Sequence, residues 1–424
     1  MTRQDIQDYI HYGIVAGIAV TFPFAIKLNS FLILLLAVNW FLEPHIFPRI
    51  RRTFSNPVNI CFILLFLMHV LSALMSTNHH EGWAIVERRL SLLAFPLILF
   101  RPISVKELRI VSLAFVSGVI TALIVCYCKA FPFFFHSGDV GVFFYHRLSE
   151  AIHMNAVYLS AYVILCLHVL LYLMDWKNRN LKLLFLTGFA FLVISIIMLE
   201  SKMMLFILVM GFTFWFFRFS PFKSKQNRVS YITGTLFFLT ILFIIPQTKS
   251  RFRTEFHTDL TVLKKDSFND DTRFTGTSLR LQIWKQCFGI QSEKKAWFTG
   301  VGTGDFQDLL NNKYRQLKIY TGNPSLHDTG YIGYGPHNEY IELLFSLGPL
   351  AFILFLYLIF FQFRIAWKSN NYLYLQVLFL FCLFCVTESV LSTNKGIVFF
   401  TFFLVLLNSR SQTEKGWVVE KNKV

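Results

Sequence analysis

The chain has 424 residues, of which 55% are hydrophobic and only 15% are charged, and its formal net charge is +16. A soluble protein of this size would expose far more charge, so the composition predicts a membrane protein. Most Lys and Arg residues lie in short segments between apolar stretches, which is the ordinary signal of membrane topology and argues against a nucleic-acid-binding protein.

About twelve apolar stretches have the composition of membrane-spanning helices, for which about 20 apolar residues are needed. We therefore predict an all-α polytopic membrane protein with one membrane domain, residues 1–424, and about twelve transmembrane helices. In chain order the stretches are residues 10–26, 28–43, 58–76, 90–100, 107–128, 151–174, 182–199, 203–218, 229–246, 337–362, 371–388 and 396–408. Residues 1–7 are polar and no small-residue cleavage site follows, so we expect no cleaved signal peptide.

The distribution of charge predicts which side of the membrane each loop faces. Lys and Arg concentrate in segments 44–57, 101–106, 175–181, 219–228 and 363–370 and in the C-terminal tail, whereas the short segments opposite carry few. Because cytoplasmic loops carry the excess of Lys and Arg, these basic segments and both termini are predicted to be cytoplasmic.

One outer loop, residues 247–336, is long enough to have structure of its own, and we predict that it forms a subdomain between the ninth and tenth spans. Its first predicted helix covers residues 279–288, with Ser278 as N-cap and Gly289 at the end. Arg280 and Trp284 are four residues apart and therefore share one face of this helix. A glycine-rich turn follows at residues 300–304, and Asp305 is expected to cap a second helix through residue 318.

His337 and Asn338 lie where this polar loop meets the next apolar stretch. His337 is interpreted in one of two ways: as an amphipathic residue at headgroup level or as a general base. A histidine in the first turn of a helix feels the positive end of the helix dipole, which disfavours the imidazolium and leaves the ring able to accept a proton. Asn338 would orient that ring or bind a substrate hydroxyl, and Gly348 would let a neighbouring helix approach.

Lys202 and Arg280 are candidates for binding phosphate on the outer face. Lys202 stands between two apolar stretches, so it is either a lysine reaching for the membrane surface or a phosphate ligand. Arg280 is either a solvated or stacked surface residue or a fork of hydrogen-bond donors for phosphate. Trp284, beside Arg280, is a further candidate for substrate binding.

Three more charged residues near predicted helix ends complete the candidate set. Arg88 and Arg89 precede an apolar stretch and would bind phosphate, unless they serve a salt bridge to Glu87. Glu388 lies at the outer end of an apolar stretch, where charged groups are usually paired or functional. Its partner would be Lys395 or an arginine of the substrate site.

Several signatures of cofactor chemistry are missing from the sequence. There is no G-x-x-x-x-G-K-[ST] phosphate-binding loop and no H-E-x-x-H or other metal-ligand spacing. The glycine-rich turn at residues 300–304 lacks the βαβ context of a dinucleotide-binding fingerprint. We therefore predict no cofactor and no metal.

The segment from His337 resembles a known pattern. His337-Asn338, nine residues and then Gly348 resembles the H-[NSQ]-x9-G-x-x-[GTY] signature of O-antigen ligases, within the O-antigen ligase/polymerase superfamily. Ala351 stands at the last position, where that pattern has Gly, Thr or Tyr. About twelve spans, cytoplasmic ends and one large outer loop between the ninth and tenth spans are also similar to that superfamily.

Other parts of the chain resemble the same superfamily. The helix carrying Arg280 and the glycine turn at residues 300–304 look like its loop helix and glycine turn. Ser201-Lys202 lies where the family often has Ser-Arg, and a lysine offers a point charge in place of the bidentate arginine fork.

The resemblance implies a metal-independent membrane glycosyltransferase of the bacterial inner membrane with a periplasmic active site. The donor would be a glycan on undecaprenyl diphosphate, and the acceptor would be a sugar hydroxyl of lipid A–core. His337 would act as general base, while Arg280 and Lys202, with Arg88 or Arg89, would bind the diphosphate.

Three alternatives stay open at this point. An O-antigen polymerase and a protein O-oligosaccharyltransferase belong to the same superfamily and differ in acceptor. A transporter or flippase for lipid-linked glycans is the alternative from another class, and it would be expected to show repeat-related halves and broken helices near the midplane. The sequence shows no such symmetry.

Overall fold

The computed structural model describes residues 3–24, 26–43, 46–174, 179–220, 224–244, 258–265, 267–269, 274–323 and 328–421, and the single residues 249, 253, 272 and 325. Parts of the predicted loops 44–57, 175–181, 219–228 and 247–336 therefore lie outside the described residues. The described residues are almost all helical or in turns, and their one β-bridge joins Asn323 and Asp328.

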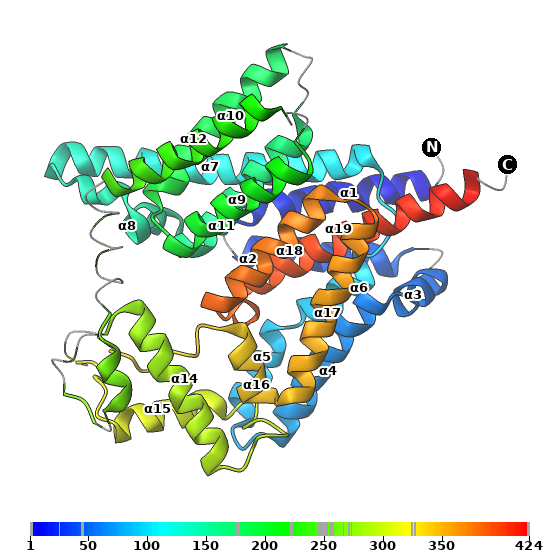
Figure 1. Ribbon diagram of the computed structural model, residues 1–424. Helices are drawn as coiled ribbons and strands as arrows, with labels where there is room; N and C mark the ends of the chain where they lie inside the picture. Colours follow the sequence, from blue (N-terminus) through cyan, green and yellow to red (C-terminus); the bar gives the residue numbers. More distant parts are fainter. Residues whose placement is uncertain are drawn as a thin grey trace.

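Helices follow one another through the chain in the order that the apolar stretches predict (Figure 1). They are α1 (Arg3–Thr21), α2 (Ile26–Phe41), α3 (Ile46–Phe54), α4 (Pro57–Met75), α5 (His79–Arg88), α6 (Ser91–Ile98), α7 (Val105–Ser137), α8 (Tyr145–Ser149), α9 (Ala156–Leu173), α10 (Arg179–Met198), α11 (Lys202–Arg218), α12 (Lys225–Ile244), α14 (Gly276–Glu293), α15 (Phe306–Gln316), α16 (Glu339–Leu347), α17 (Pro349–Lys368), α18 (Tyr372–Thr387) and α19 (Asn394–Lys421). Short 3-10 turns include η3 (Leu260–Lys264) and η5 (Val390–Ser392).

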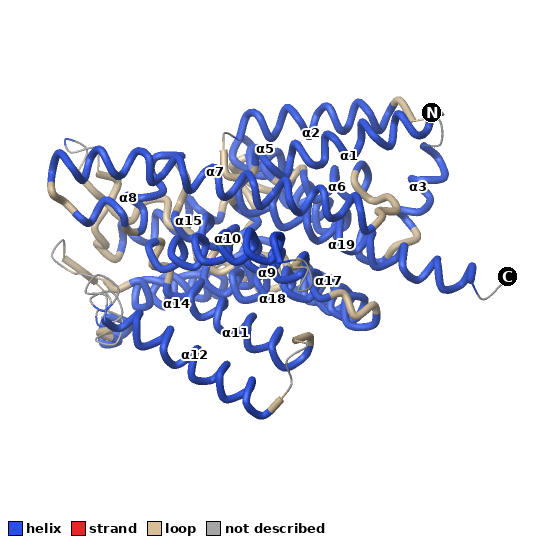
Figure 2. Tube along the Cα trace, turned by 90° about the horizontal axis from the view of Figure 1, so that it is seen from above, coloured by secondary structure: helices blue, strands red, loops and turns tan. Residues whose placement is uncertain are grey.

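The buried apolar side chains form two separate clusters. The larger cluster lies between the long helices, and the smaller one lies between α14, α15 and their neighbours. Figure 1 shows α14 and α15 as a separate part next to α5 and α16, whereas Figures 1 and 2 show the start of α1 and the end of α19 at another end of the molecule. Helix α16 contributes Leu343 to the larger cluster and Phe345 to the smaller one, so it connects the two parts.

Four described helices are long and apolar enough to cross a membrane, namely α4, α7, α9 and α17. The bent pair α2–α3 would be a fifth, while α18 and the apolar part of α10, residues 182–198, are shorter. Each of the twelve predicted stretches contains a helix, but the count of about twelve spans stays a prediction.

Two of the predicted spans need correction. The stretch 90–100 forms only the eight-residue α6, which is about 12 Å long at 1.5 Å per residue and too short to cross a bilayer by itself. The stretch 337–362 is split into α16 and α17 at Gly348, which has a left-handed φ of 81° and precedes Pro349. Glycine after a helix and proline at the start of the next are the residues that such a break favours.

Helix caps in the loop between α12 and α16 also differ from the prediction. Thr275, not Ser278, is the N-cap of α14, and Ser278 completes a reciprocal capping box from the third helical position. The helix continues through Gly289 and ends at Glu293. Helix α15 does begin after Asp305 but ends at Gln316, before residue 318.

The carboxylate of Asp305 does not cap its own helix. Its two oxygens accept hydrogen bonds from the backbone N–H groups of Thr77 and Asn78, at 2.8 and 2.7 Å. Asp305 therefore ties the loop between α12 and α16 to the connection between α4 and α5.

The glycine turn at residues 300–304 packs against the end of α16. The backbone N–H of Val301 donates to the carbonyl of Phe345 at 2.9 Å, and that of Gly302 donates to Ser346 at 3.0 Å. A Cβ atom on Gly300 would lie 2.4 Å from the Ser346 carbonyl oxygen. The turn therefore supplies hydrogen-bond donors to carbonyls at the C-terminal end of α16. It needs glycine because a side chain at this position would prevent so close an approach.

Gly348 meets the same segment of loop. A Cβ atom there would lie 2.4 Å from the carbonyl oxygen of Phe298, so Gly348 accommodates the loop and not, as predicted, another membrane helix. The same Cβ would lie 3.0 Å from the backbone nitrogen of Gly300, so Gly348 also meets the glycine turn, a contact that the sequence analysis did not predict.

Replacing Gly300 with Ala should destabilise the protein by about 1–3 kcal/mol, because alanine is strained at a φ of 71° and its Cβ would collide with α16. The midpoint of thermal unfolding of the purified protein measures this. Gly289→Ala is the matched control: it lies inside α14 with no atom within 4 Å of the added Cβ, so it should stabilise by about 0.5–1 kcal/mol. Equal midpoints for the two variants would contradict the packing argument.

Candidate active site

His337 lies just outside α16, not in its first turn as predicted. Its φ is 47°, Asn338 is the N-cap, and the helix begins at Glu339. The Asn338 Oδ1 accepts the N–H of Ile341 at 3.1 Å, and its Nδ2 donates to the carbonyl of Val386 at 2.9 Å. Both ends of the Asn338 side chain are engaged by backbone, which favours a positioning role over contact with a substrate.

Trp284 fixes the residue on the other side of His337. Its indole Nε1–H donates to the carbonyl of Pro336 at 2.7 Å. Helix α14 therefore holds the peptide bond that leads into His337, while the side chain of Asn338 ties the residue after His337 to α16 and to Val386. Trp284 and Asn338, both predicted to bind substrate, instead bond backbone groups and so position the residues on either side of the histidine.

His337, Glu388 and Arg280 come together from three different elements. The His337 Nδ1 lies 3.3 Å from Glu388 Oε2, and the Arg280 guanidinium lies 3.6 Å from Glu388 Oε1. All three side chains are partly exposed, with Glu388 the most buried at 15%. If Nδ1 donates its proton to the carboxylate, Nε2 carries the lone pair and can accept a proton.

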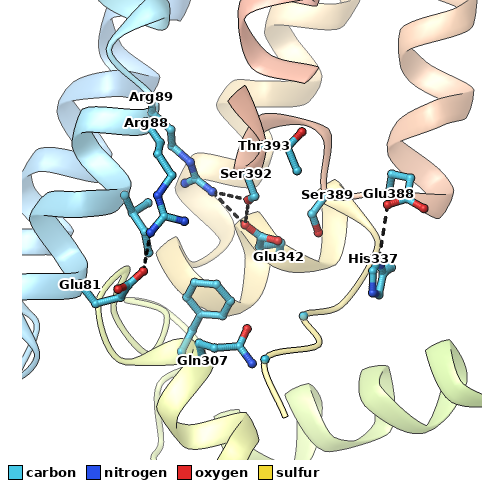
Figure 3. Close-up of a pocket in the computed structure, with 14 residues that line it drawn as sticks. Glu81, Arg88, Arg89, Gln307, His337, Glu342, Glu388, Ser389, Ser392 and Thr393 are labelled. Atoms are coloured by element: carbon cyan, nitrogen blue, oxygen red, sulfur yellow. Dashed lines mark hydrogen bonds and ion pairs between the residues drawn. The ribbon is translucent and has the colours of Figure 1, made fainter. Parts of the chain in front are cut away.

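A cavity of about 380 Å³ opens beside this histidine (Figure 3). Figure 3 shows His337 and Glu388 on one side of the cavity and Arg88 and Arg89 on the other, with Glu342 between them. Among the described residues, no three His, Cys, Asp or Glu side chains gather as a metal site. The cavity is lined by Glu81, Ile85, Arg88, Arg89, Phe306, Gln307, Gly333, Gly335, His337, Glu342, Glu388, Ser389, Ser392 and Thr393.

The neighbouring arginines Arg88 and Arg89 have different environments. Among the described residues, neither forms the ion pair with Glu87 that the sequence left open. Arg88 is partly exposed and forms an ion pair with Glu81 at 2.6 Å. Arg89 is 1% exposed and forms an ion pair with Glu342 of α16 at 2.8 Å.

Arg89 also connects elements that are far apart in the sequence. The same guanidinium nitrogen that meets Glu342 donates to the Ser392 hydroxyl at 2.9 Å, and the other terminal nitrogen lies 2.6 Å from Nδ1 of His69 on α4. These contacts occupy both terminal nitrogens of Arg89. They favour a role in holding α4, α16 and η5 together over the predicted binding of phosphate.

Glu339, which the sequence analysis did not select, is the most buried carboxyl group near the site. It is fully buried, its Oε2 accepts the N–H of Leu391 at 2.8 Å, and its Oε1 has no hydrogen-bond partner among the described residues. Burial, and next the nearby Glu342 carboxylate, raise the pKa of Glu339 above its ordinary value. The sequence did contain a signal for this residue: Glu339 and Glu342 are three residues apart at the start of a helix and therefore share one face.

Replacing Glu339 with Gln should change the pH dependence of stability. Because the pKa of Glu339 is raised above 4.5, the folded protein keeps a proton that the unfolded chain releases, and this group's stabilising contribution falls as the pH rises above 4.5. The midpoint of thermal unfolding of Glu339→Gln relative to the wild type should therefore rise between pH 5 and pH 8. A constant difference would refute the assignment.

Lys202 begins α11, and the packing of α11 shows where it lies. Arg218, at the end of α11, donates to Asn370 before α18 at 2.7 Å, and Gln376 of α18 donates to the carbonyl of Gly211. The two helices therefore run in opposite directions. Lys202, at the start of α11, therefore lies at the same end of this helix pair as Glu388, which follows α18. It is not among the residues that line the cavity.

These features define an all-helical membrane protein with a polar pocket where its long helices meet the part that contains α14 and α15. Residues 187–356 match the family model described as O-antigen ligase. The match confirms the resemblance of this part of the chain to the O-antigen ligase superfamily, a family of membrane glycosyltransferase-like ligases and polymerases. No curated protein matches the chain.

The matched residues contain part of the candidate site. His337, Arg280 and Lys202 lie within residues 187–356, whereas Glu388, Arg88 and Arg89 lie outside them. The fold therefore brings an arginine pair from before the matched region and a glutamate from after it to the histidine.

Proposed function

We propose that this protein is an O-antigen ligase-like glycosyltransferase. It moves a glycan from undecaprenyl diphosphate to a sugar hydroxyl of lipid A–core on the periplasmic side of the inner membrane, with both termini in the cytoplasm. The contact between His337 Nδ1 and Glu388 is the observation that carries the proposal, because it leaves Nε2 of a partly exposed histidine as a proton acceptor beside the cavity.

The transfer proceeds in one displacement that inverts the anomeric carbon. The acceptor hydroxyl gives its proton to His337 Nε2 as its oxygen attacks the anomeric carbon of the donor. The bond from that carbon to the phosphate oxygen breaks, and the diphosphate leaves with the electron pair. Arg88 across the cavity and Arg280 beside Glu388 stabilise the leaving charge, with Lys202 adding positive charge at this end of the bundle.

A second cavity of about 680 Å³ supports a lipid-linked donor. Arg88 lines both cavities, so the two meet at this cation. The second cavity is bounded by apolar side chains of α2, α6 and α19, including Ile33, Leu34 and Val398, and Lys395 also lines it. A diphosphate at Arg88 would thus have an apolar surface beside it for the prenyl chain.

The deciding experiment is glycan transfer by the purified protein with undecaprenyl diphosphate-linked glycan and two acceptors offered separately. Product on lipid A–core alone supports the ligase. Product only as a lengthened lipid-linked glycan identifies a polymerase, and product on neither directs the search to a protein acceptor or to transport of the lipid-linked glycan. Chelator should leave the rate unchanged, and a loss that Mg²⁺ restores would contradict the metal-independent mechanism.

A further inference from the structure

The loop tip, residues 294–299 between α14 and the glycine turn, displays large apolar side chains on its surface. Phe298 is 85% exposed and Trp297 is 42% exposed. The Trp297 ring stacks on Phe288 of α14, with ring centroids 6.2 Å apart and planes within 12°. Exposed aromatic side chains clustered in this way are typical of a surface that contacts something other than water.

The loop tip lies at the end of two candidate membrane spans. The Phe298 carbonyl is packed on Gly348, directly before α17, and the glycine turn that follows the tip contacts Ser76 beyond the end of α4. At these same ends, α17 exposes Leu350 and Ile353, and α4 exposes Leu74 and Met75. The segment that carries the exposed rings is therefore packed at the ends of two spans that turn apolar side chains outward.

Charged residues border the aromatic side chains. Lys294 and Lys295 are exposed and line a polar cavity of about 790 Å³, together with Asp305 and Asp308. Both aspartates are already engaged, Asp305 by two backbone N–H groups and Asp308 by the side-chain amide of Asn78. Tryptophan with neighbouring lysines is the combination found at membrane–water interfaces, where the ring lies at headgroup level and the ammonium groups meet lipid phosphates.

We propose that the loop tip binds the phospholipid surface at this end of α4 and α17. Trp297 and Phe298 enter the border between headgroups and acyl chains, and Lys294 and Lys295 contact lipid phosphates. Because the next residues hold the carbonyls of Phe345 and Ser346, this contact fixes the depth of α16 relative to the bilayer. The proposal does not depend on which glycan, if any, the protein transfers.

The test places a spin label on the full-length protein in nanodiscs of phosphatidylethanolamine and phosphatidylglycerol. Cys128, the exposed cysteine among those of the described residues, is first changed to Ser. Labels then replace Phe298 or, as the matched control, Gln316, an exposed residue at the far end of α15. Collision with oxygen, which concentrates in lipid, is compared with collision with a water-soluble nickel chelate.

We expect the ratio of oxygen to nickel accessibility to be several-fold higher at position 298 than at position 316. Changing Lys294 and Lys295 together to Glu should lower the ratio at position 298 without changing it at position 316. Equal ratios at the two positions would overturn the proposal. A label at position 298 that nickel reaches freely, and that a soluble glycan then protects, would also overturn it and would make the rings a sugar-binding platform.

Discussion

Replacing His337 with Gln should lower the rate of glycan transfer by about 10²–10⁴-fold, the usual contribution of a general base. Glutamine keeps a polar side chain at the cavity but cannot take up the proton of the acceptor hydroxyl. The measurement is single-turnover transfer with saturating donor and acceptor, so that binding and product release do not mask the chemical step.

His80→Gln is the matched control for this change, because His80 is exposed on α5 and does not line the cavity. It should leave the rate unchanged. Glu388→Gln should give a smaller loss than His337→Gln, since it keeps an acceptor for Nδ1–H but removes the charge that stabilises the imidazolium. Full activity of His337→Gln would remove the base from the mechanism.

The sequence predicted the helices well because hydropathy is a local property. Each of the twelve apolar stretches contains a helix. The break at Gly348 was missed, although Gly348-Pro349 was a readable signal, because the apolar residues continue without interruption across it. Likewise Thr275, which precedes the first apolar residue of α14 by four positions, was passed over in favour of Ser278.

The composition of the site depends on contacts that no local pattern contains. From the sequence, the partner of Glu388 was either Lys395 or an arginine of the substrate site. In the structure Glu388 pairs with Arg280, while Lys395 donates to the carbonyl of Phe24 at 2.6 Å. Arg89 meets Glu342 across 253 positions of the chain. Such pairs follow only from the tertiary packing of α4, α5 and α16.

Replacing Arg89 with Met should destabilise the protein by about 3–5 kcal/mol, because it leaves the buried Glu342 carboxylate without its counter-charge. The midpoint of thermal unfolding reports the loss. Arg88→Met is the natural comparison: its exposed pair with Glu81 is worth about 1 kcal/mol or less, so stability should hardly change. Transfer by Arg88→Met should instead require about tenfold more donor, as expected when a charged hydrogen bond to phosphate is lost.

A double variant separates the charge of Arg89 from its size. Arg89→Met combined with Glu342→Leu removes both buried charges, and it should recover much of the stability that Arg89→Met alone loses. If the double variant is as unstable as the sum of the two single variants, the ion pair is not what holds α5 to α16. If Arg89→Met instead keeps its stability and raises the donor requirement as Arg88→Met does, Arg89 is a phosphate ligand and its buried contacts are incidental.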